Sequence, residues 1–266
     1  MVSRSSPSDR PVRRGRVAPR APGTEPGDQL IYGKNPVREA LRGRRRVRAL
    51  LLAERGAGQD LESALLGWSA DTPGRMPPVR RMATVELTAL LGTGEHQGIA
   101  AEVDPYPYLD PPDLFRGLTL LVALDGVQDP HNLGAIIRTA EGAGAGVVIP
   151  RRRATAVTAA VVKASAGATE HAAVARVRNL TDFLGEAKQA GFWVYGAAAG
   201  AGSPYTTQDY RPPTCFVLGS EGEGLGRRVA AQCDAVVSLP LAGRIDSLNV
   251  SVSAGILLYE ALRQRT

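Results

Sequence analysis

The sequence is poor in cysteine, histidine and aromatic residues. Its 266 residues include two cysteines and three histidines, and only 5% are aromatic. Two cysteines are too few for a disulfide framework or a four-ligand zinc site. No histidines, cysteines or carboxylates are grouped at metal-ligand spacing, so we expect no metal. Cys215 and Cys233 stand in segments that read as core, and we expect both to be buried free thiols.

Long apolar runs are also missing. No run approaches the roughly 20 residues that a membrane helix needs, and the first residues carry arginines and prolines where a secretory signal needs an apolar segment. We therefore expect no membrane association and a cytoplasmic location. With 44% hydrophobic and 22% charged residues, the composition predicts a packed core, and the length suits two domains.

The chain is basic, and the excess charge is uneven. The net charge is +6 and the isoelectric point about 9.7. Residues 1–28 hold six arginines against three acidic residues, together with five prolines and almost no large apolar residue. Such a segment cannot bury enough surface to offset its ordering entropy, so we predict a disordered basic tail. The tail is equally well explained as an arm that binds phosphate and as a solubilising extension.

Residues 29–104 predict a small α/β domain. The expected helices cover 35–41, with Asn35 as cap, 61–68 and 84–91, and the expected strands cover 47–53, a segment near Val79, and 98–103. Residues 105–115 contain four of the prolines and predict an extended, stiff linker without helix.

Residues 116–266 alternate apolar runs with helical segments. The apolar runs are 118–124, 147–149, 192–195, 215–218 and 235–239, and the helical segments are 133–143, 158–166, 180–190, 224–232 and 250–263. Strands that are apolar throughout and followed by helices predict a parallel sheet covered on both faces. Ligands of such sheets bind at the carboxyl ends of the strands, so the loops 125–132, 219–224 and 239–249 are the candidate site.

Three familiar motifs are set aside. The glycine-rich segment 141–146 closes a helix and enters a strand, whereas a dinucleotide-binding loop leaves a strand and opens a helix. The segment 196–202 follows a strand but lacks the Lys-Ser/Thr of a phosphate-binding loop. Ser220 lacks the Gly-x-Ser-x-Gly spacing of a hydrolase nucleophile. A nucleotide hydrolase and a serine hydrolase are therefore both poor explanations.

The three candidate loops carry grouped polar residues. In the first, Asn132 is placed as a helix N-cap, and Arg138 falls about 150° from the buried stripe of the helix, so it should face away from the core. In the second, Glu221 stands among three glycines after a strand. In the third, Ser247 and Asn249 precede a long helix, where capping accounts for one of them.

These three segments resemble the signature motifs of the SpoU (TrmH-type) branch of the SPOUT RNA methyltransferases. The matching stretches are Asn132-Leu-Gly with Arg138, Leu218-Gly-Ser-Glu-Gly-Glu-Gly-Leu225, and Leu239-Pro-Leu-Ala-Gly with Ser247-Leu-Asn-Val-Ser251. Two further stretches, Ile31 to Leu41 and His96-Gln-Gly-Ile99, are similar to the substrate-binding domain of RlmB-type members, which is related to a ribosomal-protein (L30e-like) fold.

The resemblance implies a fold, a cofactor and site residues. The expected fold is α/β, with residues 116–266 forming a SPOUT domain that contains a parallel sheet and a deep trefoil knot, behind an RNA substrate-binding domain at 29–104. S-adenosylmethionine would lie against backbone at Gly219, Leu239 and Leu248. Arg138 is the expected catalytic residue, and Asn132, Glu221, Ser247 and Asn249 would shape its surroundings. The family also implies homodimers through the knot domain.

The implied reaction is methylation of a ribose 2′-hydroxyl in RNA. For RlmB-type members, the methylated residue is a guanosine of 23S rRNA in the peptidyl-transferase region. A guanidinium keeps its proton, so we expect Arg138 to stabilise the developing alkoxide as a cation, while the proton passes to Glu221, a phosphate or water. No DNA partner is expected. Alternatives are the same chemistry on tRNA or another rRNA site, including antibiotic-resistance sites, a catalytically silent RNA-binding assembly protein, and a Rossmann methyltransferase that uses 142–146.

Overall fold

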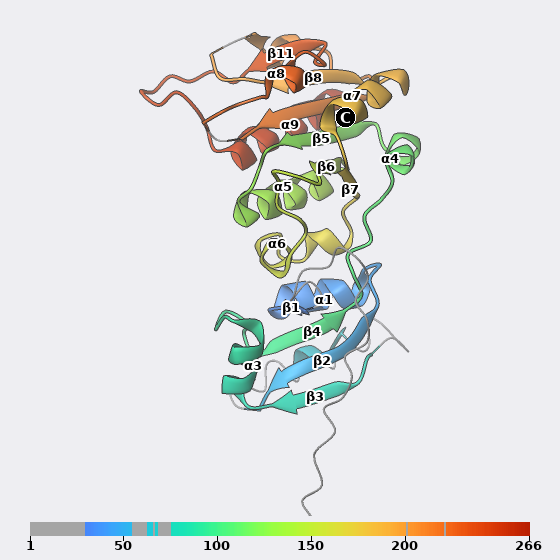
Figure 1. Cartoon of the computed structure of the whole chain (residues 1–266), viewed down its shortest axis with the longest axis vertical. Coiled ribbons are helices and arrows are strands. Elements are labelled where there is room, and N and C mark those ends of the chain that lie inside the picture. Colours follow the sequence, from blue (N-terminus) through green and yellow to red (C-terminus); the bar gives the residue numbers. More distant parts are fainter. Residues whose placement is uncertain (1–29, 55–62, 66, 69–75, 201, 221) are drawn as a thin grey trace, which may run out of the picture.

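The structure is a computed structural model that describes residues 30–266 except 55–62, 66, 69–75, 201 and 221. The predicted tail 1–28, Glu221, and residues 61, 62 and 66 of the helix expected at 61–68 lie outside the described residues, whereas residues 63–65, 67 and 68 are helical as expected. The described chain forms two β-sheets that follow one another along its longest axis (Figure 1). The architecture is α/β, as expected.

The first sheet is mixed and has the order β1-β4-β2-β3. Its strands are β1 (Leu30–Tyr32), β2 (Val47–Ala53), β3 (Val79–Met82) and β4 (Ile99–Val103), and its helices are α1 (Lys34–Arg42) and α3 (Thr84–Leu91). β4 runs antiparallel to β1 and β2, while β2 and β3 are parallel. The prediction that Asn35 caps α1 is wrong. The helix begins one residue earlier, after Gly33, whose φ of 98° suits glycine.

The segment that joins the two sheets is not extended throughout. Leu109 forms a parallel bridge with Ala175, and helix α4 (Pro111–Gly117) begins inside the proline-rich stretch. The expectation of a helix-free linker is therefore wrong at this point. Proline at the first positions of a helix needs no N–H partner and already has the helical φ, so Pro111 and Pro112 start the helix instead of breaking it.

The second sheet has seven parallel strands in the order β7-β6-β5-β10-β8-β11-β9. The strands are β5 (Leu120–Asp125), β6 (Gly146–Pro150), β7 (Val174–Val177), β8 (Trp193–Ala197), β9 (Ser203–Pro204), β10 (Thr214–Gly219) and β11 (Ala235–Ser238). Sequence analysis missed β7 and β9. Both lie at the edges of the sheet, and β7, with Arg176 among its four residues, lacks the continuous apolar run of a central strand.

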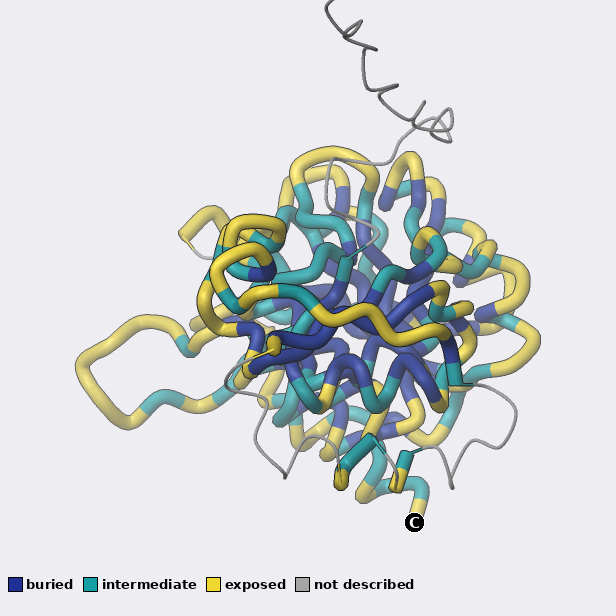
Figure 2. Tube along the Cα trace, turned by 90° about the horizontal axis from the view of Figure 1, so that it is seen from below, coloured by how far each residue is buried: buried dark blue, intermediate teal, exposed yellow. Residues whose placement is uncertain are grey.

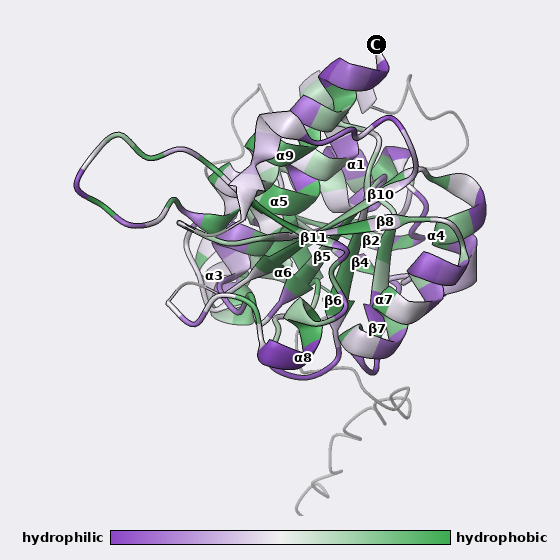
Figure 3. Cartoon of the chain, turned by 90° about the horizontal axis from the view of Figure 1, so that it is seen from above, coloured by the Kyte–Doolittle hydropathy of each residue, from purple (hydrophilic) through white to green (hydrophobic). Residues whose placement is uncertain are grey.

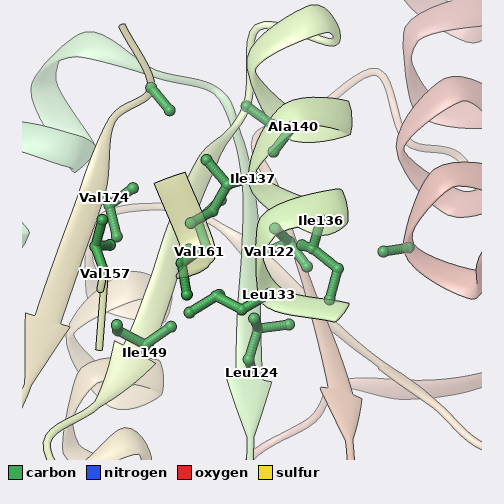
Figure 4. Close-up of a cluster of buried hydrophobic side chains, with 14 of the residues drawn as sticks. Val122, Leu124, Leu133, Ile136, Ile137, Ala140, Ile149, Val157, Val161 and Val174 are labelled. Carbon is green, nitrogen blue, oxygen red and sulfur yellow. The ribbon is translucent and has the colours of Figure 1, made fainter. Parts of the chain in front are cut away.

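Helices cover both faces of this sheet. They are α5 (Pro130–Gly142), α6 (Ala159–Ala164), α7 (Leu180–Gln189), α8 (Arg227–Ala230) and α9 (Val250–Arg265), with short 3-10 turns at Ala168–Glu170 and Tyr205–Thr207. Alternate residues of β5 enter opposite cores: Val122 and Leu124 pack with α5, α6 and α9, whereas Leu121 and Ala123 pack with α4, α7 and α8. Figure 4 shows the first of these cores, with Ile136 and Ile137 of α5 over the sheet.

The two halves share one continuous hydrophobic core. The cluster that contains β5 and α5 also includes Ile31, Val37 and Leu41 of the first half. A buried ion pair crosses the same boundary, in which Arg45 Nε donates to Glu170 Oε2 over 2.8 Å and a second nitrogen of the same guanidinium bonds to the other carboxylate oxygen. Their side chains are 2% and 0% exposed. The halves are therefore packed together as one body in this structure.

The burial pattern confirms the predicted packed interior. It also shows one long exposed loop. Buried residues follow the strands and the inner helix faces, and the loop between β11 and α9 extends away from the body (Figure 2). Within the described part of the chain, no helix is long and apolar enough to cross a membrane. The trefoil knot implied by the resemblance stays a prediction.

Candidate functional site

A cavity of about 610 Å³ opens at the carboxyl ends of β8, β10 and β11. This volume is in the range of small-molecule sites. The three residues predicted to bind a cofactor, Gly219, Leu239 and Leu248, all line it, and so does Ser247. The strand-end rule and the family resemblance thus point to the same place, although these residues are up to 29 positions apart in the sequence.

The glycine-rich loop after β10 forms one wall of the cavity. Ser220 forms a bridge with Gly224, whose N–H donates to the Ser220 carbonyl over 3.0 Å. The turn is so tight that a Cβ on Gly219 would stand 2.1 Å from the Gly224 carbonyl group. Gly222 and Gly224 have φ of 89° and 65°, which favours glycine. The glycines therefore shape the wall, whereas the predicted site residue Glu221 lies outside the described residues.

The loop from Leu239 to Asn249 supplies the opposite wall. Its two ends, Leu239 with Leu241 and Asp246 with Leu248, line the cavity, while the residues between them extend away from the body, as Figures 2 and 3 show. Ile245 in this extended part is 66% exposed. The base of this loop therefore forms part of the cavity wall, while the tip of the loop is exposed to solvent in the single chain.

Asn249 and Asn132 are brought into contact. Asn249 caps α9, because its Oδ1 accepts from the Ser251 N–H at 2.9 Å, and its Nδ2 donates to Asn132 Oδ1 at 2.9 Å. The prediction that Asn132 caps α5 is wrong. Asp129 is the cap, accepting from the N–H groups of His131 and Asn132, and Pro130 occupies the first helical position. The Asn132 side chain is thereby left available to α9.

Arg138 projects from the solvent side of α5, as its helical position predicted. It is exposed, whereas Leu133, Ile136 and Ile137 of the same helix are fully buried. Arg138 makes no hydrogen bond or ion pair with the described residues, and it does not line the cavity of its own chain. One turn further along, a Cβ on Gly142 would meet Tyr259 Oη at 3.2 Å, so this face of α5 lies beside α9.

Sequence analysis missed two contributors to the site. Ala197, Ala198 and Ala199 line the cavity, although their segment was considered only as a phosphate loop. Ala197 ends β8 and the other two follow it, so the rule that ligands bind at strand ends could have found them. Asp125 ends β5 and accepts the Gly226 N–H at 2.8 Å, which anchors the far end of the glycine-rich loop. The rejected segment 141–146 ends α5 and enters β6, away from the cavity.

The cavity suits a cofactor with an apolar ring and a positive charge. Alanines and leucines make up much of its wall, and the carboxylates of Glu223 and Asp246 also line it. Among the described lining residues there is no lysine, arginine or histidine, so the cavity has no cation to hold a phosphate group. S-adenosylmethionine combines adenine with a sulfonium cation. The residues present therefore fit this cofactor better than they fit a nucleotide.

Two family models match the chain, one for each half. The RNA 2′-O ribose methyltransferase substrate-binding model matches residues 30–109, and the SpoU rRNA Methylase family model matches residues 119–259. Among curated proteins, the chain is 41% identical over 243 residues to YacO of Bacillus subtilis, which is assigned to the TrmH family of tRNA/rRNA methyltransferases. The match covers 88% of this chain and 95% of YacO.

Solved structures resemble both halves together. An S-adenosylmethionine-bound rRNA methyltransferase from Sinorhizobium meliloti has a TM-score of 0.72 and 28% identity, covering 89% of this chain and 87% of that one. The SpoU methyltransferase AviRb from Streptomyces viridochromogenes, also with S-adenosylmethionine, has a TM-score of 0.72 and 29% identity, covering 89% and 90%. The chain therefore belongs to the SpoU (TrmH) family and is an S-adenosylmethionine-dependent RNA ribose 2′-O-methyltransferase with the family's RNA substrate-binding domain.

Proposed function

We propose that the enzyme methylates the 2′-hydroxyl of a guanosine of 23S rRNA in the peptidyl-transferase region, as RlmB-type members of the family do. The observation that carries this proposal is the substrate-binding match at residues 30–109, which precedes the methylase match in one chain. The S. meliloti structure, which resembles both halves, is that of an rRNA methyltransferase. The sheet arrangement supports domain bounds of 29–104, 105–115 and 116–266.

The proposed reaction is a direct displacement. When bound, S-adenosylmethionine supplies the electrophilic methyl carbon: the ribose oxygen forms a bond to it, the carbon–sulfur bond breaks, and neutral S-adenosylhomocysteine leaves. Gly219, Leu239 and Leu248 hold the cofactor through backbone and apolar contacts at the cavity wall. Ser247 and Asn249 shape the ribose site from the adjoining loop. The hydroxyl proton passes to Glu221, an RNA phosphate or water.

Arg138 is the proposed catalytic residue. Its exposure supports a role as a cation that aligns the hydroxyl and stabilises the negative charge that develops on the oxygen. Asn132, six residues before it on α5, is held toward α9 by Asn249. This contact supports a common site built from the first and third motifs.

The working form is proposed to be a homodimer through the second half of the chain. Val252 and Tyr259 lie on one side of α9, seven residues apart, and each is 50% exposed; Ile245 in the extended loop is 66% exposed. Arg138 does not line the cavity of its own chain. This observation supports a site in which Arg138 acts beside cofactor held mainly by the partner subunit.

Transfer of a labelled methyl group tests the substrate. The purified protein is incubated with labelled S-adenosylmethionine and either unmodified 23S rRNA or bulk tRNA, and the labelled nucleotide is mapped by nuclease digestion. We expect label on a guanosine 2′-oxygen of 23S rRNA. Label confined to tRNA or to another rRNA nucleotide would overturn the substrate and keep the chemistry. Bound cofactor without transfer to any RNA would favour a silent assembly protein.

The same chemistry on tRNA is the second candidate. The name of YacO includes both tRNA and rRNA, so this relative does not separate the two substrates. The paired incubations with 23S rRNA and bulk tRNA separate them directly.

A further inference from the structure

A cluster of arginines stands beside the site and takes no part in the functions described above. Arg151, Arg152 and Arg153 leave the carboxyl end of β6, and Arg178 leaves the end of the neighbouring β7. All four are exposed. Adjacent parallel strands end side by side, and the N–H of Arg151 donates to the Val177 carbonyl over 2.7 Å, so the two exits form one surface. We call these four residues the arginine strip.

The arginine strip has no carboxylate to neutralise it. None of its four members forms an ion pair with a described residue. Next to it, Arg176 places a guanidinium nitrogen 3.4 Å from the Arg151 carbonyl, and its Nε is the one buried side-chain polar atom, among the described residues, without a hydrogen-bond partner. Elsewhere on the surface, arginines such as Arg116 and Arg211 pair with aspartates in their own segments. Unpaired arginines at this density favour a polyanion.

One end of the strip reaches the mouth of the cavity. A Cβ built on Gly126 would lie 3.4 Å from Ser220 Cβ and 3.9 Å from the Arg153 carbonyl oxygen, so Arg153 and Ser220 flank the same point. Ser220 lines the cavity. Arg153 has a φ of 58°, a conformation that non-glycine residues adopt rarely and that concentrates at functional sites.

The chain that follows the arginine strip leads to contacts with the substrate-binding half. The loop that begins with Arg151 continues into α6, where Lys163 Nζ donates to the Glu95 carbonyl at 3.0 Å and to Gln97 Oε1 at 3.2 Å. Tyr108, at the end of the connecting segment, accepts from the Val157 N–H in the same loop at 2.8 Å. The loop therefore joins the cavity mouth to the half that matches an RNA substrate-binding domain.

We propose that the arginine strip binds the phosphodiester backbone of the substrate RNA where the strand passes from the substrate-binding half to the methylation site. The contact is electrostatic and independent of base identity, because exposed guanidinium groups read phosphates and not base edges. It positions the target ribose and accelerates no chemical step. This inference rests on RNA being the substrate, but not on which RNA is methylated.

The test compares two charge-matched variants of the full chain. The first, called the strip variant, combines Arg152→Gln with Arg153→Asn. Asparagine is chosen because it tolerates the positive φ at position 153. The control is Arg116→Gln with Arg211→Gln, which removes two exposed arginines of the same half that are paired with aspartates. Binding of fluorescent oligo(U) RNA is measured over a salt series with S-adenosylmethionine present.

The strip variant should bind oligo(U) on the order of tenfold more weakly, and the slope of log K against log salt should become shallower by about 0.7 for each lost phosphate contact. Its KM for RNA should rise while kcat and cofactor affinity stay at the wild-type values. The control should keep the wild-type slope. Arg178→Gln provides a second variant outside the 151–153 loop, with an expected loss of about 0.7 in the slope.

The outcomes separate this inference from the proposed function. A strip variant and an Arg178→Gln variant with the wild-type salt slope and KM would overturn the inference, whichever RNA is methylated, and so would an equal loss in the control. If the variants show the expected slope changes but the wild-type protein labels tRNA, the strip stays assigned to RNA and the 23S rRNA substrate is overturned. If the variants show these changes but the wild-type protein transfers no methyl group, the strip stays assigned to RNA and the catalytic role is overturned.

Discussion

Asn249 uses the two ends of one amide for two different contacts. Its Oδ1 caps α9 by accepting from Ser251, while its Nδ2 donates to Asn132 Oδ1 over 2.9 Å. Asn132 and Asn249 are 117 residues apart, and the hydrogen bond ties the first turn of α5 to the start of α9. The first and third sequence motifs are therefore physically one structure.

The two contacts of Asn249 can be separated by substitution. Asn249→Ser keeps a good N-cap but cannot reach Asn132, so we expect the free energy of unfolding to fall by about 1 kcal/mol and turnover to fall with it. Asn249→Ala also loses the cap, so its free energy of unfolding should fall by about 1 kcal/mol more. Denaturant titration and single-turnover methyl transfer measure the two effects. Wild-type turnover in Asn249→Ser would show that the contact with Asn132 is only structural.

Arg138→Ala should bind S-adenosylmethionine with wild-type affinity, because the proposed role of Arg138 is to stabilise charge on the ribose oxygen, while the cofactor is held by other residues that line the cavity. Loss of one group that stabilises developing negative charge typically lowers kcat by about 10²- to 10³-fold, and we expect a loss of that size. Arg138→Lys retains the charge and should recover part of it. Calorimetry for the cofactor and initial rates for RNA provide the measurements. Unchanged kcat in Arg138→Ala would remove the catalytic assignment.

Gly219→Ala should abolish cofactor binding, since the added methyl group would stand 2.1 Å from the Gly224 backbone and push the two strands of the loop apart. A matched control is Gly185→Ala. Gly185 lies inside α7 with nothing near its Cβ position, so the change should stabilise the protein by about 0.5–1 kcal/mol. In thermal unfolding, we expect the midpoint temperature to fall in Gly219→Ala and to rise in Gly185→Ala. Normal cofactor affinity in Gly219→Ala would contradict the close approach.

Arg45 and Glu170 form the buried ion pair between the halves. Arg45→Met leaves the Glu170 carboxylate buried without its partner and should lower the free energy of unfolding by about 3–5 kcal/mol. Arg45→Met combined with Glu170→Leu removes both charges and should recover most of that loss. Denaturant unfolding of the two variants measures the difference. Equal stability of the single and double variants would mean that the pair is not buried in solution.

The two thiols should be inert at neutral pH. Burial, followed by the neighbouring Asp234 carboxylate, raises the pKa of Cys233 to about 11, and burial raises the pKa of Cys215 as well. At pH 8 a thiol with that pKa is about 10⁻³ thiolate, the form that reacts. Iodoacetamide should therefore label both residues slowly in the folded protein and rapidly in urea. Rapid labelling of the folded protein would contradict the burial of these side chains.

Regular features of the fold were predictable where one physical signal dominated. Continuous apolar runs identified the central strands such as β10, because both of their faces are covered. The helical period placed Arg138 on the exposed side of α5. Of the two cysteines, Cys215 is buried as expected, while Cys233 is only partly buried.

Features set by competition between neighbouring signals were not predictable in this way. Asp129 and Asn132 are both good caps, and Pro130 decides between them because it fits the first helical position only if the cap is Asp129. Edge strand β7 carries Arg176, and its pattern resembles a loop. The contact between Asn132 and Asn249 joins residues 117 positions apart, and no local pattern encodes it.

The shared core and the Arg45–Glu170 pair have a consequence for how substrates are chosen. Because one hydrophobic cluster runs through both halves, we expect the distance between the substrate-binding half and the cavity to stay nearly constant when RNA binds. We then expect the enzyme to accept an RNA only if the RNA's own fold places the recognised element and the target ribose at this distance from each other. Where they are spaced differently, the RNA has to bend, because the protein keeps its shape.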